Sequence, residues 1–127
     1  MHIVSVEIGK CLKENGFDEL TNVRRQHGHG ISGTVEGELD YYNRKGDAYI
    51  ALPTIGEVVM WLYDKYGIWI GVHGWTNQPV DDEVWKNCFH AYVNGDNMDA
   101  AIFKTPTEAY LAGIQYALNN IVNQKPI

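Results

Sequence analysis

Two histidines one residue apart form the pattern that comes closest to chemistry in this sequence. His27 and His29 lie in a His-Gly-His-Gly segment. In an extended strand this spacing points both imidazoles to the same side, which suits a zinc ion once a third ligand approaches. The candidate third ligands are His73, His90, Cys88 and Asp40. Because histidines in glycine-flanked loops are usually solvated, a metal-dependent enzyme using His27 and His29 is the alternative hypothesis, and no metal is predicted.

A second pattern, Cys88 followed by His90, could supply a nucleophile and its base. On one strand the two side chains would share a face. However, no flanking motif exposes the thiol on a strained turn or at a helix start, where reactive cysteines generally lie. A packed thiol is therefore the better interpretation of Cys88, and no catalytic residue is predicted.

Three further patterns have structural interpretations. The carboxylates of residues 81–83 are adjacent in sequence, whereas an acid–base pair needs two groups in distinct environments. Asn94, Asp96, Asn97 and Asp99 resemble part of a calcium loop but lack a glycine and a terminal glutamate at the required spacing. Residues 28–33 spell the dinucleotide-binding fingerprint without the strand and helix that should flank it. No cofactor is predicted.

The aromatic content is more suggestive of function. Four Trp, eight Tyr and three Phe in one small domain exceed what a core of this size readily absorbs. Exposed Trp and Tyr side chains suit protein recognition or self-association, because they combine a large rigid contact area with a polar tip. The predicted contact residues are Trp69, His73, Trp75 and Tyr92. Alternatively, some tryptophans simply fill a helix–sheet interface: Trp61, Trp69 and Trp85.

The helices that would position these residues are marked by capping signals. Ser5 and Gly16 bracket an amphipathic segment and predict a helix over residues 5–15. The stretches TIGE, which begins at Thr54, and TPTE, which begins at Thr105, are Thr-x-x-Glu capping boxes directly before apolar runs. They predict a second helix that stops at Gly67 and a third that closes the domain.

Period-two alternation and turn residues predict the strands. Short strands are expected over residues 48–52, 68–73, 85–93 and 100–103, with a reversing turn at Asn94 and Gly95. The glycine-rich stretch 23–47 is irregular in composition, and the alternation over residues 31–39 fits an edge strand or a mobile loop equally well. The expected order is α-(irregular/β)-β-α-β-β-β-α, which describes an α+β domain over residues 1–127. It would contain about three helices and a mainly antiparallel sheet of three to five strands.

Composition limits the classes of partner. The chain has 127 residues, of which 45% are hydrophobic and 20% charged, as in ordinary globular domains. A formal net charge of −6 disfavours nucleic-acid binding, which depends on Lys and Arg. The sequence shows no long apolar run and no secretory signal, and it has only two cysteines, so we expect no membrane partner and a cytoplasmic location.

Three segments carry a resemblance to a known group of proteins. They are GFDEL at residues 16–20, LPTIGEVVMWLYDKYGIWI at 52–70 and FKTPTEAYLAGIQYALNNI at 103–121. Together they resemble small uncharacterised proteins encoded by Bacteroidetes genomes and their phages or prophages; residues 23–47 lie outside the likeness. The resemblance implies an intracellular protein of mobile-element origin, and it brings no reaction and no catalytic residues. The leading hypothesis is thus a non-enzymatic domain that binds a protein or a second copy of itself.

Overall fold

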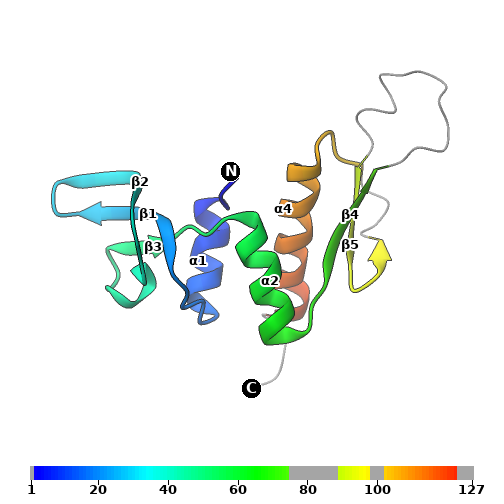
Figure 1. Ribbon diagram of the computed structural model, residues 1–127, viewed down its shortest axis with the longest axis horizontal. Helices are drawn as coiled ribbons and strands as arrows, with labels where there is room; N and C mark the ends of the chain where they lie inside the picture. Colours follow the sequence, from blue (N-terminus) through cyan, green and yellow to red (C-terminus); the bar gives the residue numbers. More distant parts are fainter. Residues whose placement is uncertain (1, 75–88, 98–101, 123–127) are drawn as a thin grey trace. The chain divides into compact units, whose positions relative to one another are not determined.

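The computed structural model describes residues 2–74, 89–97 and 102–122 of the chain. The chain divides into two compact units, Met1–Glu57 and Val58–Ile127. Each unit contains antiparallel strands together with helical segments (Figure 1). This confirms the α+β class, although the strands belong to two sheets rather than one. The expectation of a single domain over residues 1–127 stays a prediction.

The first helix, α1 (Val6–Glu14), begins and ends where the capping signals predicted. Ser5 is the N-cap and its hydroxyl accepts a hydrogen bond from a backbone N–H of the first turn. At the other end Gly16 has a φ of 86°, and the N–H of Phe17 donates to the carbonyl of Leu12 at 2.9 Å. This is the hydrogen-bond pattern of a Schellman stop, in which the residue after the glycine packs back on the helix.

A three-stranded antiparallel sheet follows α1. It consists of β1 (Thr21–Gly28), β2 (Ile31–Asp40) and β3 (Tyr49–Ala51), in the order β2-β1-β3. Most of the glycine-rich stretch 23–47 is therefore regular structure. Of the two interpretations of residues 31–39, the edge strand is confirmed and the mobile loop is wrong.

The two faces of this sheet are covered by different elements. A Cβ added to Gly9 of α1 would lie only 2.7 Å from Leu52 and 3.2 Å from Ile50, so α1 packs closely on the face that carries these side chains. Neighbouring residues of a strand point to opposite faces, and Tyr49 stacks on Tyr42 at 6.4 Å on the other side. Tyr42 belongs to η1 (Tyr42–Arg44), a short 3-10 helix.

The capping box before α2 (Ile55–Tyr66) is complete. The N–H of Thr54 donates to Glu57 Oε1 at 2.9 Å, and the N–H of Glu57 donates to Thr54 Oγ1 at 3.2 Å. The helix ends at Gly67, which has a φ of 69°. Both predicted boundaries of α2 are thus confirmed. The boundary between the two compact units falls within α2, between Glu57 and Val58.

The second unit contains a sheet with the order β4-β5-β6. Its strands are β4 (Ile70–Gly74), β5 (Phe89–Val93) and the two-residue β6 (Asp96–Asn97). The last described helix, α4 (Pro106–Ala117), packs on β4 and β5 and continues into the π-helical turn η2 (Leu118–Val122) (Figure 1). Thr105 caps α4 and accepts a hydrogen bond from the N–H of Glu108, as the second box predicted.

A short strand that was not predicted, β6, follows the turn after β5. Asn94 and Gly95 both have positive φ, of 53° and 86°, so the predicted reversing turn is present. A turn of this kind lets pairing resume at once, and β6 pairs with β5 directly after it. Of the predicted strand 100–103, Phe103 forms an antiparallel bridge with Phe89. Residues 100 and 101 of that strand lie outside the described residues, as do residues 85–88 of the predicted strand 85–93.

Candidate functional site

The paired strands β4 and β5 have one apolar face and one aromatic, polar face. A Cβ added to Gly113 of α4 would lie 2.9 Å from Ile70, 3.6 Å from Ala91 and 4.0 Å from Val93, so α4 covers the face formed by these residues. Alternation places the other residues of the two strands on the opposite face: Gly71, His73, His90 and Tyr92. The period-two alternation of the two strands implies this division, which directs His73 and Tyr92 away from α4.

Trp69 continues this second face just before β4. Its side chain is 54% exposed, and its indole Nε1 lies 3.6 Å from the position that a Cβ would occupy on Gly71. Gly71 pairs with Tyr92 across the sheet. The Tyr92 ring in turn meets the imidazole of His73 edge to face, with 6.5 Å between the ring centroids. Three of the four predicted contact residues therefore lie side by side.

Helix α2 adds residues that sequence reasoning missed. Tyr63 is 50% exposed, and its ring meets the Trp69 indole edge to face at 5.9 Å. Met60, one turn earlier on α2, is 54% exposed. The sequence signal was the spacing, because positions 60 and 63 lie three residues apart and share a side of the helix. We call the set Tyr63, Trp69, Tyr92 and His73 the aromatic row.

The backbone of Trp69 is held by the turn after β5. The N–H of Trp69 donates to Asn94 Oδ1 at 2.8 Å, and the N–H of Asn94 donates to the carbonyl of Trp69 at 2.8 Å. Asn94 adopts a positive φ, which asparagine tolerates better than most residues. The exposed indole therefore projects from a backbone position that is hydrogen-bonded to the turn after β5.

The remaining tryptophans, Cys88 and His90 are either buried or lie outside the described residues. Trp75, the fourth predicted contact residue, lies outside the described residues, as do Trp85 and Cys88. His90 lies on the same sheet face as His73 but is buried. Trp61 is also buried, which agrees with a packing role for that tryptophan.

The His-x-His pair does not have the geometry expected of it. His27 is in β1, but His29 has a φ of 55° and forms the two-residue turn between β1 and β2 together with Gly30. The pair therefore does not share one extended strand. His29 stacks near Tyr49 with 6.4 Å between the ring centroids, and His27 Nδ1 lies 3.4 Å from the hydroxyl of Ser32.

No third ligand joins these histidines in the part of the chain that the structure describes. His27 pairs with Ser32 near the turn of the β1–β2 hairpin. Asp40 pairs with Thr21 at the other end of the hairpin, away from His27. More generally, the described residues contain no group of three or more His, Cys, Asp or Glu side chains placed to hold a metal ion. The structure also shows, within the same residues, no helix of the length and apolarity that crossing a bilayer requires.

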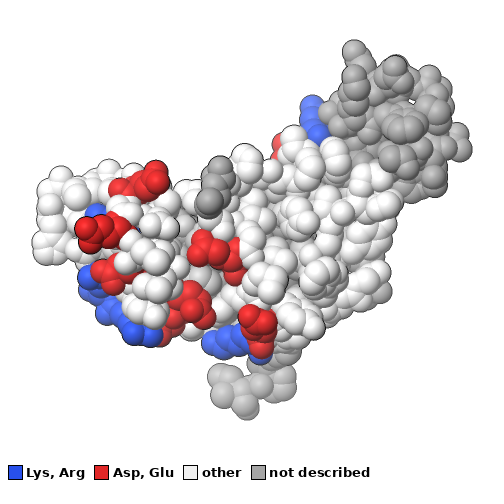
Figure 2. All heavy atoms as spheres, in the orientation of Figure 1, with Lys and Arg blue, Asp and Glu red and all other residues white. Residues whose placement is uncertain are grey.

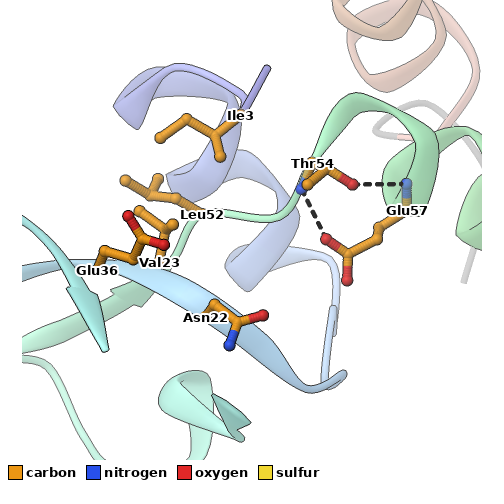
Figure 3. A pocket seen from close by; sticks show the side chains of 7 residues that line it. All are labelled: Ile3, Asn22, Val23, Glu36, Leu52, Thr54 and Glu57. Atoms are coloured by element: carbon orange, nitrogen blue, oxygen red, sulfur yellow. Dashed lines mark hydrogen bonds between the residues drawn. The ribbon is translucent and has the colours of Figure 1, made fainter. Parts of the chain in front are cut away.

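Two open hollows of about 560 Å³ each lie in the first unit. One is shown in Figure 3, where the capping box of Thr54 and Glu57 forms part of its wall opposite Glu36. The capping hydrogen bonds already engage the polar atoms of Thr54 and a carboxylate oxygen of Glu57. The second hollow is lined by charged side chains of both signs, Glu7, Asp47, Lys10 and Arg25, and by His27.

Charged side chains are also paired around the end of β2. Lys45 lies 3.0 Å from Asp40 and lowers the pKa of that carboxyl group, and the backbone N–H of Tyr41 lowers it further. Asp18 lies 2.6 Å from Arg44 and raises the pKa of its guanidinium. On the face shown in Figure 2, Lys and Arg are interspersed with Asp and Glu. The described residues of the first unit that are visible there form no continuous basic surface for a polyanion.

Comparison with known proteins gives no relative. No protein-family model matches the chain, and no curated protein or solved structure was found to be similar to it.

Proposed function

We propose that the chain is a non-enzymatic protein-binding domain whose contact surface is the aromatic row. The observation that carries this proposal is the half-exposed indole of Trp69, which contacts Tyr63 on one side and overlies Gly71, next to Tyr92, on the other. Tryptophan and tyrosine dominate the binding energy of protein interfaces, since each buries a large area at a small entropic cost.

The composition of the row favours a protein partner. Its rings have polar tips, namely the indole N–H of Trp69, the two tyrosine hydroxyls and the His73 imidazole, so each can accept or donate hydrogen bonds at an interface. Met60 adds an exposed, adaptable apolar side chain to the same unit. The net charge of −6 further disfavours nucleic acid as the partner.

The biological setting rests on the resemblance alone. The segments GFDEL, LPTIGEVVMWLYDKYGIWI and FKTPTEAYLAGIQYALNNI support an intracellular protein of phage or mobile-element type. In that setting the partner would be a protein of the same cell or a second copy of the chain.

Replacing Trp69 with alanine tests the role of the row. We expect Trp69→Ala to weaken binding by about tenfold or more, as for a central interface tryptophan, and to leave the fold intact because the side chain is half exposed. Tyr116→Ala is the matched control, since Tyr116 is an exposed aromatic residue on α4, which covers the other sheet face. Sedimentation equilibrium measures self-association, and quantitative affinity capture from cells compares the proteins bound by each variant. Equal association and equal capture by both variants would rule out the row as the contact surface.

A further inference from the structure

The outer edge of β2 presents unpaired backbone groups. The N–H of His27 donates to Ala48 and the N–H of Leu52 donates to Val23, so the odd-numbered residues of β1 bond to the β3 side. The even-numbered residues of β1 therefore bond to β2, where their partners are odd-numbered: Arg24 pairs with Val35. It follows that the even-numbered residues in the regular part of β2, Ser32, Thr34 and Glu36, direct their N–H and C=O groups outward. The carbonyl of Glu38, by contrast, accepts a hydrogen bond from the Tyr42 hydroxyl. No described strand pairs with that edge.

Part of the hairpin also lacks a third strand. β3 pairs with only three residues of β1, Arg24 to Gln26, whereas β2 pairs with β1 as far as the turn at Gly28. Most of β2 is exposed on both faces. Because a two-stranded ribbon is marginally stable in water, a further strand along β2 would stabilise this part of the sheet.

The residues of β2 are arranged symmetrically about Val35. Residues 31–39 read Ile-Ser-Gly-Thr-Val-Glu-Gly-Glu-Leu. If β2 of a second chain ran antiparallel to this segment with its Val35 opposite Val35, then Thr34 of one chain would lie opposite Glu36 of the other, and Gly33 opposite Gly37. Further out, Ser32 meets Glu38, and Ile31 meets Leu39. The last two are large apolar residues that are 38% and 55% exposed in the single chain.

This pairing also places a hydrogen-bond donor opposite each carboxylate of the segment. Every glutamate of the segment faces a hydroxyl group of the other copy, which can donate a hydrogen bond to the carboxylate. A parallel in-register pairing, or an antiparallel one centred on Glu36, would instead oppose two carboxylates, which is destabilising. The β1–β2 register shifts by two residues between Thr21 and Val23. The central pairs, Val35 with Val35 and Thr34 with Glu36, lie in the regular part of β2.

We propose that β2 pairs antiparallel with β2 of a second copy of this chain, with Val35 opposite Val35. The result is a continuous six-stranded sheet with the order β3-β1-β2-β2-β1-β3 and a twofold axis through its centre. Such an interface is self-complementary, as closed dimers require, and its backbone hydrogen bonds follow the known mode of strand addition. This interface lies in the unit Met1–Glu57 and does not depend on the aromatic row.

Cysteine substitution tests the register. In this pairing the two copies of residue 35 form a pair without backbone hydrogen bonds, with Cα atoms about 4.5 Å apart, which is within reach of a disulfide. Val35→Cys should therefore give a 35–35 intermolecular disulfide, identified by peptide mass spectrometry. The matched control is Leu39→Cys, because the two copies of residue 39 would lie about 27 Å apart. A chain carrying both Ile31→Cys and Leu39→Cys should instead form 31–39 crosslinks.

Charge substitution tests the pairing of Thr34 with Glu36. Thr34→Lys should tighten the dimer and Thr34→Glu should weaken it, with dissociation constants that differ by about tenfold because the dimer contains two such pairs. Sedimentation equilibrium measures both constants, and the difference should shrink at high salt.

Two results would overturn the proposal. One is a wild-type chain that stays monomeric up to its solubility limit together with a Val35→Cys variant that gives no 35–35 disulfide, including the case in which β2 takes up a different protein. The other is equal crosslinking at positions 35 and 39. Adding Trp69→Ala to the Val35→Cys chain separates this proposal from the proposed function, since the double variant should still form the 35–35 disulfide whether or not the aromatic row binds a partner.

Discussion

Replacing Gly113 with leucine is expected to destabilise the unit that carries the aromatic row by about 3 kcal/mol, a typical upper value for overpacking. At Gly113, α4 packs closely on the sheet, because an added Cβ would lie 2.9 Å from Ile70 and 3.6 Å from Ala91. A leucine there must push α4 away from β4 and β5. The strands that hold Trp69 and Tyr92 would then lose their support.

The control for this substitution is a helical glycine in open space. A Cβ on Gly56 of α2 would meet nothing within 4 Å, and alanine favours the helix over glycine by up to about 1 kcal/mol. Gly56→Ala should therefore be neutral or stabilising in urea unfolding, while Gly113→Leu should unfold at a clearly lower urea concentration. If Gly113→Leu matched the wild type, the close packing of α4 on the sheet would be wrong.

Replacing Phe17 with alanine is expected to cost about 3–5 kcal/mol in the first unit. Phe17 is among the largest fully buried side chains, and its N–H closes the end of α1 on Leu12. Its carbonyl also accepts a hydrogen bond from Asn43 Nδ2 at 2.9 Å, and Asn43 Oδ1 accepts one from the N–H of Ala51 at 2.8 Å. The cavity would therefore lie where α1, η1 and β3 meet.

Leu20→Ala provides the comparison for Phe17→Ala. Leu20 lies three residues further on and is 36% exposed, so its truncation should change the free energy of unfolding by about 0.5 kcal/mol or less. Unfolding in urea, followed by circular dichroism, measures both variants. Equal losses for Phe17→Ala and Leu20→Ala would contradict the assignment of Phe17 to the core.

Helix boundaries were the most predictable part of this fold. The signals at Ser5, Gly16, Thr54, Gly67 and Thr105 all proved correct, because each satisfies orphaned backbone groups through a side chain or a glycine a few residues away. Such interactions are local in sequence, and no knowledge of tertiary contacts is needed to infer them.

The β1–β2 hairpin was harder to predict for the opposite reason. Its turn uses His29 and Gly30, both with positive φ, rather than the usual Asn-Gly pair. The glycines of β2 also weaken its strand signal. The middle of β1 also pairs with β3, which lies more than twenty residues further along the chain from Arg24.

The candidate site could be inferred only in part. Period-two alternation correctly separated His73 and Tyr92 from the apolar face, because this property depends on the strand alone. Tyr63 on α2 was not among the predicted contact residues, although it is half exposed. The width of the buried stripe depends on what packs against the helix, and one sequence does not contain that information.

The central claim is that the aromatic row contacts another protein, and site-specific photo-crosslinking in cells tests it most directly. A photoreactive phenylalanine analogue would replace Trp69 in one variant and Tyr116 in another, and mass spectrometry would identify the adducts. We expect adducts of defined mass from position 69, either with a second copy of the chain or with another protein, and none from position 116. An absence of adducts at position 69, or the same adducts at both positions, would contradict the claim.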